Sequence, residues 1–360
     1  MSFEIKRKAT RQIRVGQVKV GGGAPIAVQS MTNTHTQDIP GTVAQIKRLE
    51  AAGCEIVRVA VPDAEAAAAI TKIKKEITIP LIADIHFDYQ LAIAAADAGA
   101  DGLRINPGNI GSHERIQAVV AAAKSNGIPI RVGVNSGSLE PDLLKKYNGV
   151  TVDGLVESAL RQIELMATLD FTDLKLAIKS ANVPQSIDAY RRLSEKTDFP
   201  LHVGITEAGG LYSGIVKSSI GIGMLLADGI GDTLRVSLTR DPVEEVRVGF
   251  EILKALGLRQ RGPEIISCPT CGRCNIDLFS IAETVETALL TRTAPIKIAI
   301  MGCVVNGPGE AREADVGIAG GDGIGILFKK GEVVKKFPED QLVDELLKAV
   351  AEFEENNTTI

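Results

Sequence analysis

Apolar and polar positions follow one repeating order from about residue 24 to residue 257. A short apolar run ends in polar residues, and an Ala-rich stretch with the period of an amphipathic helix follows it. The runs predict strands at Ile26–Ser30, Ile56–Val61, Leu81–His86, Gly102–Asn106, Ile128–Asn135, Leu174–Lys179, Leu201–Thr206 and Thr233–Leu238. The stretches between them predict helices at Gly41–Ala52, Ala64–Lys75, Tyr89–Ala98, Glu114–Lys124, Asp153–Leu169, Ser186–Glu195, Gly214–Ala227 and Pro242–Leu256.

Eight strand–helix units in succession are typical of an α/β protein with a (β/α)₈ TIM-type barrel. A doubly wound sheet is the second interpretation, but such sheets usually contain only about five or six units. We therefore expect a barrel domain over residues 1–258.

The repeat ends after Leu258, where Arg-Gln-Arg-Gly-Pro at 259–263 has the composition of a linker. Beyond it, short apolar runs alternate with Gly-rich turns and two helical stretches, at Ile276–Leu290 and Asp340–Glu354. This pattern predicts a smaller α+β domain over residues 264–360.

Composition narrows the function classes. Of the 360 residues, 45% are hydrophobic and 24% are charged, which is ordinary for a globular protein, and the net charge of −5 gives no general attraction for nucleic acid. No run approaches the roughly 20 apolar residues of a membrane span. The basic N-terminus lacks the apolar segment of a signal peptide. We therefore expect a cytoplasmic protein with neither nucleic acid nor membrane as a partner.

Four of the five cysteines gather in the C-terminal third. Cys268, Cys271 and Cys274 form a C-x₂-C-x₂-C run, and Cys303 follows 29 residues later in a Gly/Pro-rich segment. Soft thiolates select zinc or an iron–sulfur cluster, so the pattern favours a metal centre of one of these two kinds. A redox-active C-x-x-C pair or buried structural thiols are the remaining interpretations. Cys54 stands apart at the start of a strand and is expected in the core.

Basic residues occupy positions in the predicted barrel strands where a buried charge is costly unless it is paired. Several follow the two-residue period of a strand, so their side chains should converge at the carboxyl-terminal mouth of the barrel, where active sites of this fold lie. Converging cations indicate an anionic ligand, with phosphate or diphosphate as the natural candidate. Alternatively, some of them only pair with Asp84, Glu207 or Asp232. The residues are Arg58, Arg104, Arg131, Lys175, Lys179 and Arg235.

Three further polar residues stand at predicted strand ends. Asp84 and His86 close the third run, where they would either take part in catalysis or orient the cations. Glu207 lies in the glycine loop Gly204–Gly210 after the seventh run, and a carboxylate among arginines is either an acid/base or a salt-bridge partner.

Four segments resemble one known family, and the resemblance covers essentially the whole chain. They are Val28-Gln-Ser-Met-Thr-Asn-Thr34, the loop Gly204–Gly210, Cys268-Pro-Thr-Cys271, and Met-Gly-Cys303-Val-Val-Asn-Gly-Pro-Gly-Glu310-Ala. This set is similar to the 4-hydroxy-3-methylbut-2-en-1-yl diphosphate synthases of the non-mevalonate isoprenoid pathway. The resemblance implies an oxidoreductase that opens 2-C-methyl-D-erythritol 2,4-cyclodiphosphate reductively and removes a hydroxyl, giving 4-hydroxy-3-methylbut-2-enyl diphosphate.

The same resemblance implies a [4Fe–4S] cluster held by Cys268, Cys271, Cys303 and Glu310 and reduced by ferredoxin or flavodoxin. A carboxylate is a harder and more labile ligand for iron than a thiolate, so a substrate oxygen would be able to replace Glu310. Cys274 departs from the family pattern, since that position is usually not cysteine. It is either a spare thiol or a competitor of Glu310.

The family likeness also fixes expectations for the site and the assembly. We assign catalysis to Glu207 as proton donor, with Glu310, Asp84 and His86. In the two-domain bacterial form, the cluster domain of one subunit resembles a lid over the barrel of its partner, so a homodimer is expected.

Two alternatives stay open: a non-redox barrel enzyme for a phosphorylated or pterin-like substrate with a structural zinc domain, and a non-enzymatic iron–sulfur scaffold. Substrate binding is assigned to Arg58, Arg104, Arg131, Asn135, Lys179 and Ser237.

Overall fold

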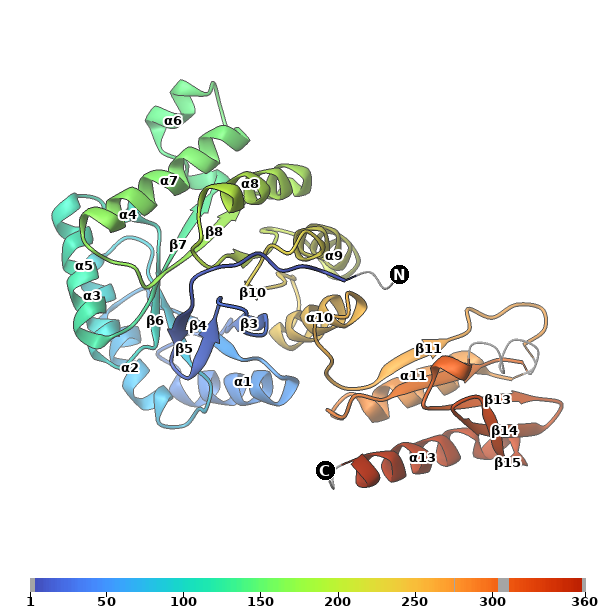
Figure 1. Cartoon of the computed structure of the whole chain (residues 1–360). Helices are drawn as coiled ribbons and strands as arrows, with labels where there is room; N and C mark the ends of the chain where they lie inside the picture. Colours follow the sequence, from blue (N-terminus) through green and yellow to red (C-terminus); the bar gives the residue numbers. More distant parts are fainter. Residues whose placement is uncertain (1–3, 275, 304–310, 358–360) are drawn as a thin grey trace. The chain divides into compact units, whose positions relative to one another are not determined.

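The computed structural model describes residues 4–274, 276–303 and 311–357. The chain divides into two compact units, residues 1–259 and 260–360, and Figure 1 shows the elements of each. The division falls within the segment that the sequence predicts as a linker.

The first unit is a barrel of eight parallel strands, as predicted. Neighbouring strands pair in the order β8-β7-β6-β5-β4-β3-β10-β9, and a bridge between Leu176 and Leu201 joins the two ends of this order. The strands are β3 (Ala27–Met31), β4 (Ile56–Ala60), β5 (Leu81–Asp84), β6 (Gly102–Ile105), β7 (Ile130–Asn135), β8 (Leu174–Lys179), β9 (His202–Val203) and β10 (Thr233–Leu234). The helices are α1 (Ile39–Ala52), α2 (Ala64–Lys74), α3 (Tyr89–Asp97), α4 (Pro107–Ile110), α5 (His113–Asn126), α6 (Pro141–Lys146), α7 (Val152–Thr168), α8 (Val183–Lys196), α9 (Leu211–Ala227) and α10 (Pro242–Ala255).

Local sequence explains where the helices begin and end. Asp63 precedes α2, and its carboxylate accepts a hydrogen bond of 2.8 Å from the Ala66 amide, which the first helical turn leaves without an intrahelical partner. Asp241 caps α10 in the same way, through the Val243 amide. Gly53 ends α1 in the left-handed conformation (φ 98°), which costs glycine little.

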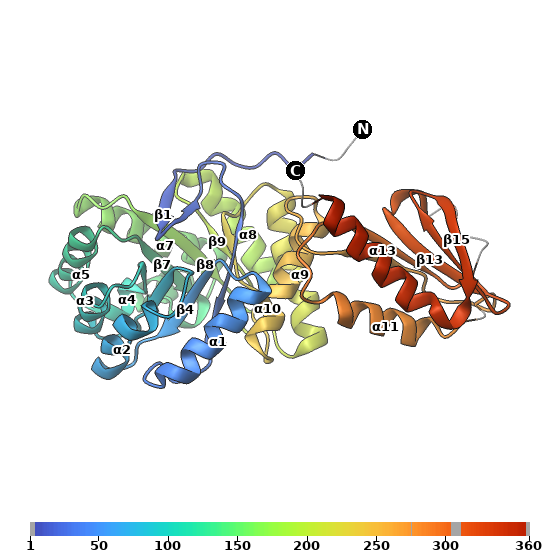
Figure 2. The same cartoon turned by 90° about the horizontal axis from the view of Figure 1, so that it is seen from below.

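A hairpin that the sequence pattern did not predict lies against one end of the barrel. It consists of the antiparallel strands β1 (Ile13–Val15) and β2 (Val18–Val20), each only three residues long. Their apolar side chains pack with Ile56 and Ile82, which stand near the starts of β4 and β5. The segment before the hairpin is bound to loops at the same end, because the Lys8 and Arg11 amides donate to the carbonyls of residues 229 and 198 (Figure 2). The amino-terminal end of the barrel is therefore covered.

The seventh and eighth strands are shorter than the apolar runs suggest. Only His202–Val203 and Thr233–Leu234 form strands, where the pattern predicted six residues each. After β10 the chain bends toward α10, and the Leu238 amide donates to Glu245 instead of a neighbouring strand. β5 likewise ends at Asp84, two residues earlier than predicted.

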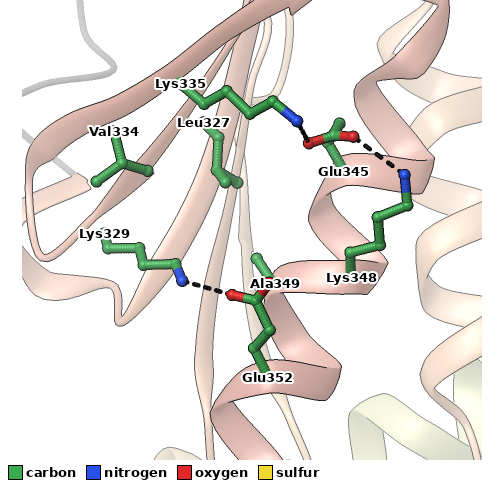
Figure 3. A pocket seen from close by; sticks show the side chains of 8 residues that line it. All are labelled: Leu327, Lys329, Val334, Lys335, Glu345, Lys348, Ala349 and Glu352. Atoms are coloured by element: carbon green, nitrogen blue, oxygen red, sulfur yellow. Dashed lines mark hydrogen bonds and ion pairs between the residues drawn. The ribbon is translucent and has the colours of Figure 1, made fainter.

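The second unit is the predicted α+β domain. Its five-stranded sheet has the order β11-β12-β13-β14-β15, with β11, β12 and β13 parallel and the last two pairings antiparallel. A hollow with a volume of about 360 Å³ is lined by residues of β14, β15 and α13. Figure 3 shows the side chains that line it. It is lined largely by lysines and glutamates in ion pairs. The elements are β11 (Glu264–Ser267), α11 (Leu278–Leu289), β12 (Lys297–Met301), β13 (Val316–Gly321), β14 (Ile324–Lys329), β15 (Glu332–Pro338) and α13 (Leu342–Asn357).

Candidate functional site

Polar side chains fill the middle of the barrel. Along each strand, alternate residues such as Val57 and Val59 of β4 belong to the core beneath the helices, so the residues between them face inward. Interiors of this fold are usually packed with branched apolar side chains. Here every strand instead places a buried polar side chain inside: Gln29, Arg58, Asp84, Arg104, Arg131, Lys175, His202 and Thr233.

Strand register places four of these charges in one row. Asp84 pairs with Arg104 across β5 and β6, Arg104 with Arg131 across β6 and β7, and Arg131 with Lys175 across β7 and β8. Parallel neighbours at the same register point to the same face. The row therefore holds three cations beside one carboxylate.

Asp84 is the carboxylate that balances part of this charge. Its oxygens lie 3.0 Å from Arg104 Nη1, 3.5 Å from Arg58 Nε and 3.6 Å from His86 Nε2. Burial alone would raise the pKa of Asp84, but Arg58, the hydrogen-bonded His86 and Arg104 together hold that pKa well below its usual range. Asp84 is thus an ionised anchor for two arginines.

The other interior cations have less compensation. Arg131 is 3% exposed, and its Nε and Nη1 atoms have no hydrogen-bond partner among the described residues. Burial, and then the neighbouring Arg58 and Arg104, lower the pKa of Arg131 well below its ordinary value. Burial and Arg131 do the same to the pKa of Lys179. A bound anion would remove this penalty, so the arrangement is suited to an anionic ligand.

Two glycines make room for the cations. A Cβ atom on Gly133 would lie 3.3 Å from Arg104 Nε, and one on Gly204 would lie 3.2 Å from Lys179 Nζ and 2.6 Å from a backbone carbonyl. A larger residue at 204 would therefore displace backbone as well as the lysine. These glycines contribute to the site because the absence of a side chain leaves room for Arg104 and Lys179.

Arg235 is neutralised by a residue that the sequence analysis did not single out. Its Nε and Nη2 atoms donate to the two carboxylate oxygens of Glu245 on α10, at 3.1 and 3.2 Å. Met31 lies between Arg235 and Arg58, and its sulfur is 3.0 Å from Arg58 Nη2. Glu245 was missed because it has the spacing of an ordinary helix-surface glutamate. His202 was missed because one histidine in an apolar run gives no distinct signal.

The remaining barrel candidates lie at or above the carboxyl ends of the strands. Asn135 is next to Arg104, whose Nη2 lies 3.2 Å from the amide oxygen in the orientation that satisfies both groups. His86 is 54% exposed and contacts Arg104 Nη1 at 3.2 Å. Ser237 follows β10 and is half-buried. Glu207 is exposed in a left-handed backbone conformation (φ 51°), and among the described residues it forms no ion pair with an arginine or lysine.

The cysteine segments leave two adjacent parallel strands. β11 and β12 are paired in register, with Ser267 opposite Ile300, and the Cys268 amide donates to the Ile300 carbonyl at 3.1 Å. Cys268 thus begins the loop after β11, and Cys303 follows the end of β12 by two residues. Carboxyl ends of parallel neighbours meet at one sheet edge. The fold therefore brings the two segments to the same edge.

The thiols themselves are not gathered into a finished ligand set. Within residues 4–274, 276–303 and 311–357, no three His, Cys, Asp or Glu side chains are close enough to hold one metal ion. Glu310, the fourth predicted ligand, lies outside the described residues.

Cys274 turns toward the second cysteine segment. Its sulfur would be 2.5 Å from a Cβ atom on Gly302, the residue before Cys303, and it also lies 3.4 Å from the Ile276 carbonyl oxygen. Three thiols in the loop after β11 and one after β12 are a donor set that suits an iron–sulfur cluster or zinc. The residues present therefore fit the cofactor class predicted from the sequence.

Comparison with known families assigns the chain to one of them. Residues 10–250 match the family described as GcpE TIM-barrel domain, and residues 264–352 match the GcpE protein C-terminal domain. The chain belongs to the GcpE family. A relative from Desulfotalea psychrophila is 60% identical over 354 residues, which cover 98% of this chain and 97% of the relative. One from Geobacter sulfurreducens is 59% identical over 341 residues, covering 95% and 97%.

Both GcpE relatives are named 4-hydroxy-3-methylbut-2-en-1-yl diphosphate synthase (flavodoxin), so the resemblance found in the sequence is confirmed. The match does not favour the alternative of a non-redox barrel enzyme with a structural zinc domain. Among solved structures, Yersinia pestis dihydropteroate synthase aligns with 68% of this chain and 98% of its own at 14% identity and a TM-score of 0.49. Among the helices described for this GcpE chain, none has the length and apolarity to span a membrane.

Proposed function

We propose that this protein is a 4-hydroxy-3-methylbut-2-en-1-yl diphosphate synthase. It converts 2-C-methyl-D-erythritol 2,4-cyclodiphosphate into 4-hydroxy-3-methylbut-2-enyl diphosphate by two-electron reduction, opening the ring and removing a hydroxyl. The near full-length family match supports the reaction. The single structural observation that supports the substrate is the excess of buried positive charge in the barrel, because a cyclic diphosphate brings the two negative charges that this interior lacks.

The diphosphate binds at the carboxyl-terminal mouth of the barrel. Arg131 supplies guanidinium nitrogens that have no hydrogen-bond partner among the described residues. Lys179 lies four residues beyond Lys175 on β8, where it meets the ligand. Arg58 and Arg104 are held in place by Asp84, so they present their charge with little loss of side-chain freedom. Asn135 and Ser237 complete the polar rim.

Protons are handled at the same rim. His86 contacts both Asp84 and Arg104 and is half exposed, so it orients the ligand at the mouth of the barrel. Glu207 extends from a glycine loop at the mouth without a cationic partner among the described residues, which leaves its carboxyl available as the proton donor to the leaving hydroxyl.

The cofactor is a [4Fe–4S] cluster held by Cys268, Cys271, Cys303 and Glu310. The convergence of the two cysteine segments at one edge of the C-terminal sheet supports this set. When bound, the cluster supplies the electrons that the reduction requires, one at a time. Cys274 packs beside Gly302, the residue before Cys303, where it is either a spare thiol or a competitor of Glu310.

Flavodoxin or ferredoxin is the electron donor, and the enzyme is a cytoplasmic homodimer. The printed name of the relatives supports flavodoxin. An exposed apolar stripe on α9 supports self-association, because Tyr212, Val216, Ile220 and Met224 recur every four residues and are all exposed. Light scattering should give twice the chain mass.

Anaerobic purification with iron, acid-labile sulfide and zinc analysis tests the cofactor. We expect a brown protein with about four irons and four sulfides per chain, as a [4Fe–4S] cluster requires. Cys303→Ser should lose the cluster, whereas the matched variant Cys54→Ala, which alters a buried thiol in the barrel core, should retain it. A colourless protein with one zinc per chain would overturn the proposal. Turnover of the cyclic diphosphate by the reduced brown protein then tests the reaction itself.

A further inference from the structure

One buried amine in the barrel takes no part in the substrate binding and proton transfer proposed above. Lys175 lies on β8 in the middle layer of the interior and is 1% exposed. Its Nζ atom has no hydrogen-bond partner within the described part of the chain. A buried lysine is usually paired, because an isolated ammonium loses its hydration without compensation.

The groups around Lys175 make a charged state still less favourable. Arg131 is its register neighbour on β7 and has partnerless nitrogens of its own, and His202 on β9 also has a buried nitrogen, Nε2, without a described partner. Arg58 on β4 adds further positive charge within the same interior, and Lys179 on β8 is a second buried amine there. The nearest compensating carboxylate, Asp232 before β10, already accepts from Arg7, Thr10 and the Leu201 amide.

Two like charges without water or a counter-ion do not both persist in such a site, and an arginine does not give up its proton at ordinary pH. The amine of Lys175 is therefore the group that loses its proton. Burial, followed by Arg131, lowers the pKa of Lys175 to about 7, with Asp232 opposing the shift. This direction agrees with the argument from position and contacts.

We propose that Lys175 is a positioning residue that is largely neutral in the ligand-free barrel and takes up a proton when the anionic substrate binds. The inference rests on the proposed function, because it needs an anion above the charged row. The lone pair of Nζ accepts a proton from solvent, and the resulting ammonium is balanced by the new negative charge. Each phosphorus of the cyclic diphosphate carries one strongly acidic oxygen, so the substrate remains a dianion near neutral pH and the proton goes to the protein.

Both the proton uptake and the affinity for substrate should depend on pH through Lys175. Below about pH 6 Lys175 is already protonated in the free protein, so binding takes up little. Above pH 7 the free amine is neutral and the bound form is charged, so each substrate bound takes up a proton and affinity falls as pH rises. Two other buried bases lie nearby, Lys179 and His202, and burial followed by Arg131 lowers the pKa of each well below its usual value.

Isothermal titration calorimetry of the holoprotein with 2-C-methyl-D-erythritol 2,4-cyclodiphosphate, without reductant, measures this uptake. Titrations at pH 8 in buffers of different ionisation enthalpy should show about one proton taken up per substrate, and the number should decrease toward pH 6. In Lys175→Met the uptake at pH 8 should be lost, whereas Lys72→Met, at an exposed position on α2, should behave as the wild type.

Each outcome decides between the two proposals. Binding without proton uptake in the wild type overturns the role of Lys175 and leaves the proposed function intact. Undiminished uptake in Lys175→Met also overturns it and assigns the proton to another buried base, which Lys179→Met and His202→Gln would then identify. Failure of the wild type to bind the cyclic diphosphate overturns the proposed function together with this inference. The wild-type buffer series decides the question of uptake even where the variant does not fold.

Discussion

Two regions of the molecule are rich in lysine, arginine and carboxylates, and they treat charge in opposite ways. In the hollow of the C-terminal unit, three lysines meet two glutamates: Lys335 and Lys348 contact Glu345, and Lys329 lies 2.9 Å from Glu352 (Figure 3). Each of these charges has a partner and most remain in water. In the barrel, Arg131 and Lys175 are almost fully buried and lack such partners among the described residues.

The two regions differ in what compensates their charge: in the hollow it is another side chain, and in the barrel it is a bound ligand. Exposed ion pairs cost little to form and contribute little. Buried cations without partners destabilise the fold, and a protein retains them where a ligand later compensates the charge. The barrel interior is therefore the functional region, although the hollow has more visible ion pairs.

Removing the one compensating carboxylate of the charged row should have the largest effect. Asp84→Asn leaves Arg58 and Arg104 buried without their counter-ion, which should lower the free energy of unfolding by about 3–5 kcal/mol. Urea unfolding measures this change. Asp173→Asn, at an exposed position before β8, is the control and should be within error of the wild type. A small loss in Asp84→Asn would mean that water already compensates the arginines.

Arg131→Met should separate function from stability. Loss of a charged hydrogen-bond donor should weaken binding of the cyclic diphosphate by about 1.5–3 kcal/mol. The same change removes an uncompensated buried charge, so the free energy of unfolding should stay equal or rise. Calorimetry and urea unfolding report the two quantities, with the exposed Arg191→Met as control. Unaltered affinity would make Arg131 structural.

Acidification should reduce the contribution of Asp84 to the free energy of unfolding. Because its pKa is depressed in the folded barrel, the carboxylate stays ionised at pH 3, while in the unfolded chain it takes up a proton below about pH 4. The stability advantage of the wild type over Asp84→Asn should therefore narrow by about 1 kcal/mol between pH 5 and pH 3. An advantage that is constant or grows on acidification would contradict the ionised anchor.

The hollow should give the smallest effect. Lys329→Met removes one exposed partner of Glu352, and its side chain is 41% exposed. We expect a change in the free energy of unfolding of no more than about 0.5 kcal/mol and none in substrate binding. A loss comparable to that of Asp84→Asn would erase the contrast between the two regions.

The sequence was sufficient for the architecture because the fold repeats. Eight apolar runs with intervening helices predict a barrel without tertiary information, and period two along β7 and β8 places Arg131 and Lys179 inside. Strand ends were harder to predict. The bend toward Glu245 shortens β10, and this contact depends on α10. β15 was missed because most of its residues are exposed, so its pattern lacks a buried face.

Charge compensation could not be predicted from the sequence. Asp84, Glu207 and Asp232 were all possible partners for the cations. Only the folded barrel decides which carboxylate pairs with which cation. Asp84 takes Arg58 and Arg104, whereas Asp232 faces Arg7 near the covered end. Arg235 pairs with Glu245, which lies ten residues later in the first turn of α10, and no recognisable sequence motif links the two.

The hairpin of β1 and β2 gives the barrel a single entrance. Its Ile13, Val15 and Val20 side chains pack on Ile56 and Ile82 and cover the end opposite the mouth with apolar surface. The strength of attraction felt by an incoming anion depends on how little solvent lies behind the arginines. A hairpin that belongs to no strand–helix unit therefore strengthens the electrostatic attraction at a site on the opposite end of the barrel.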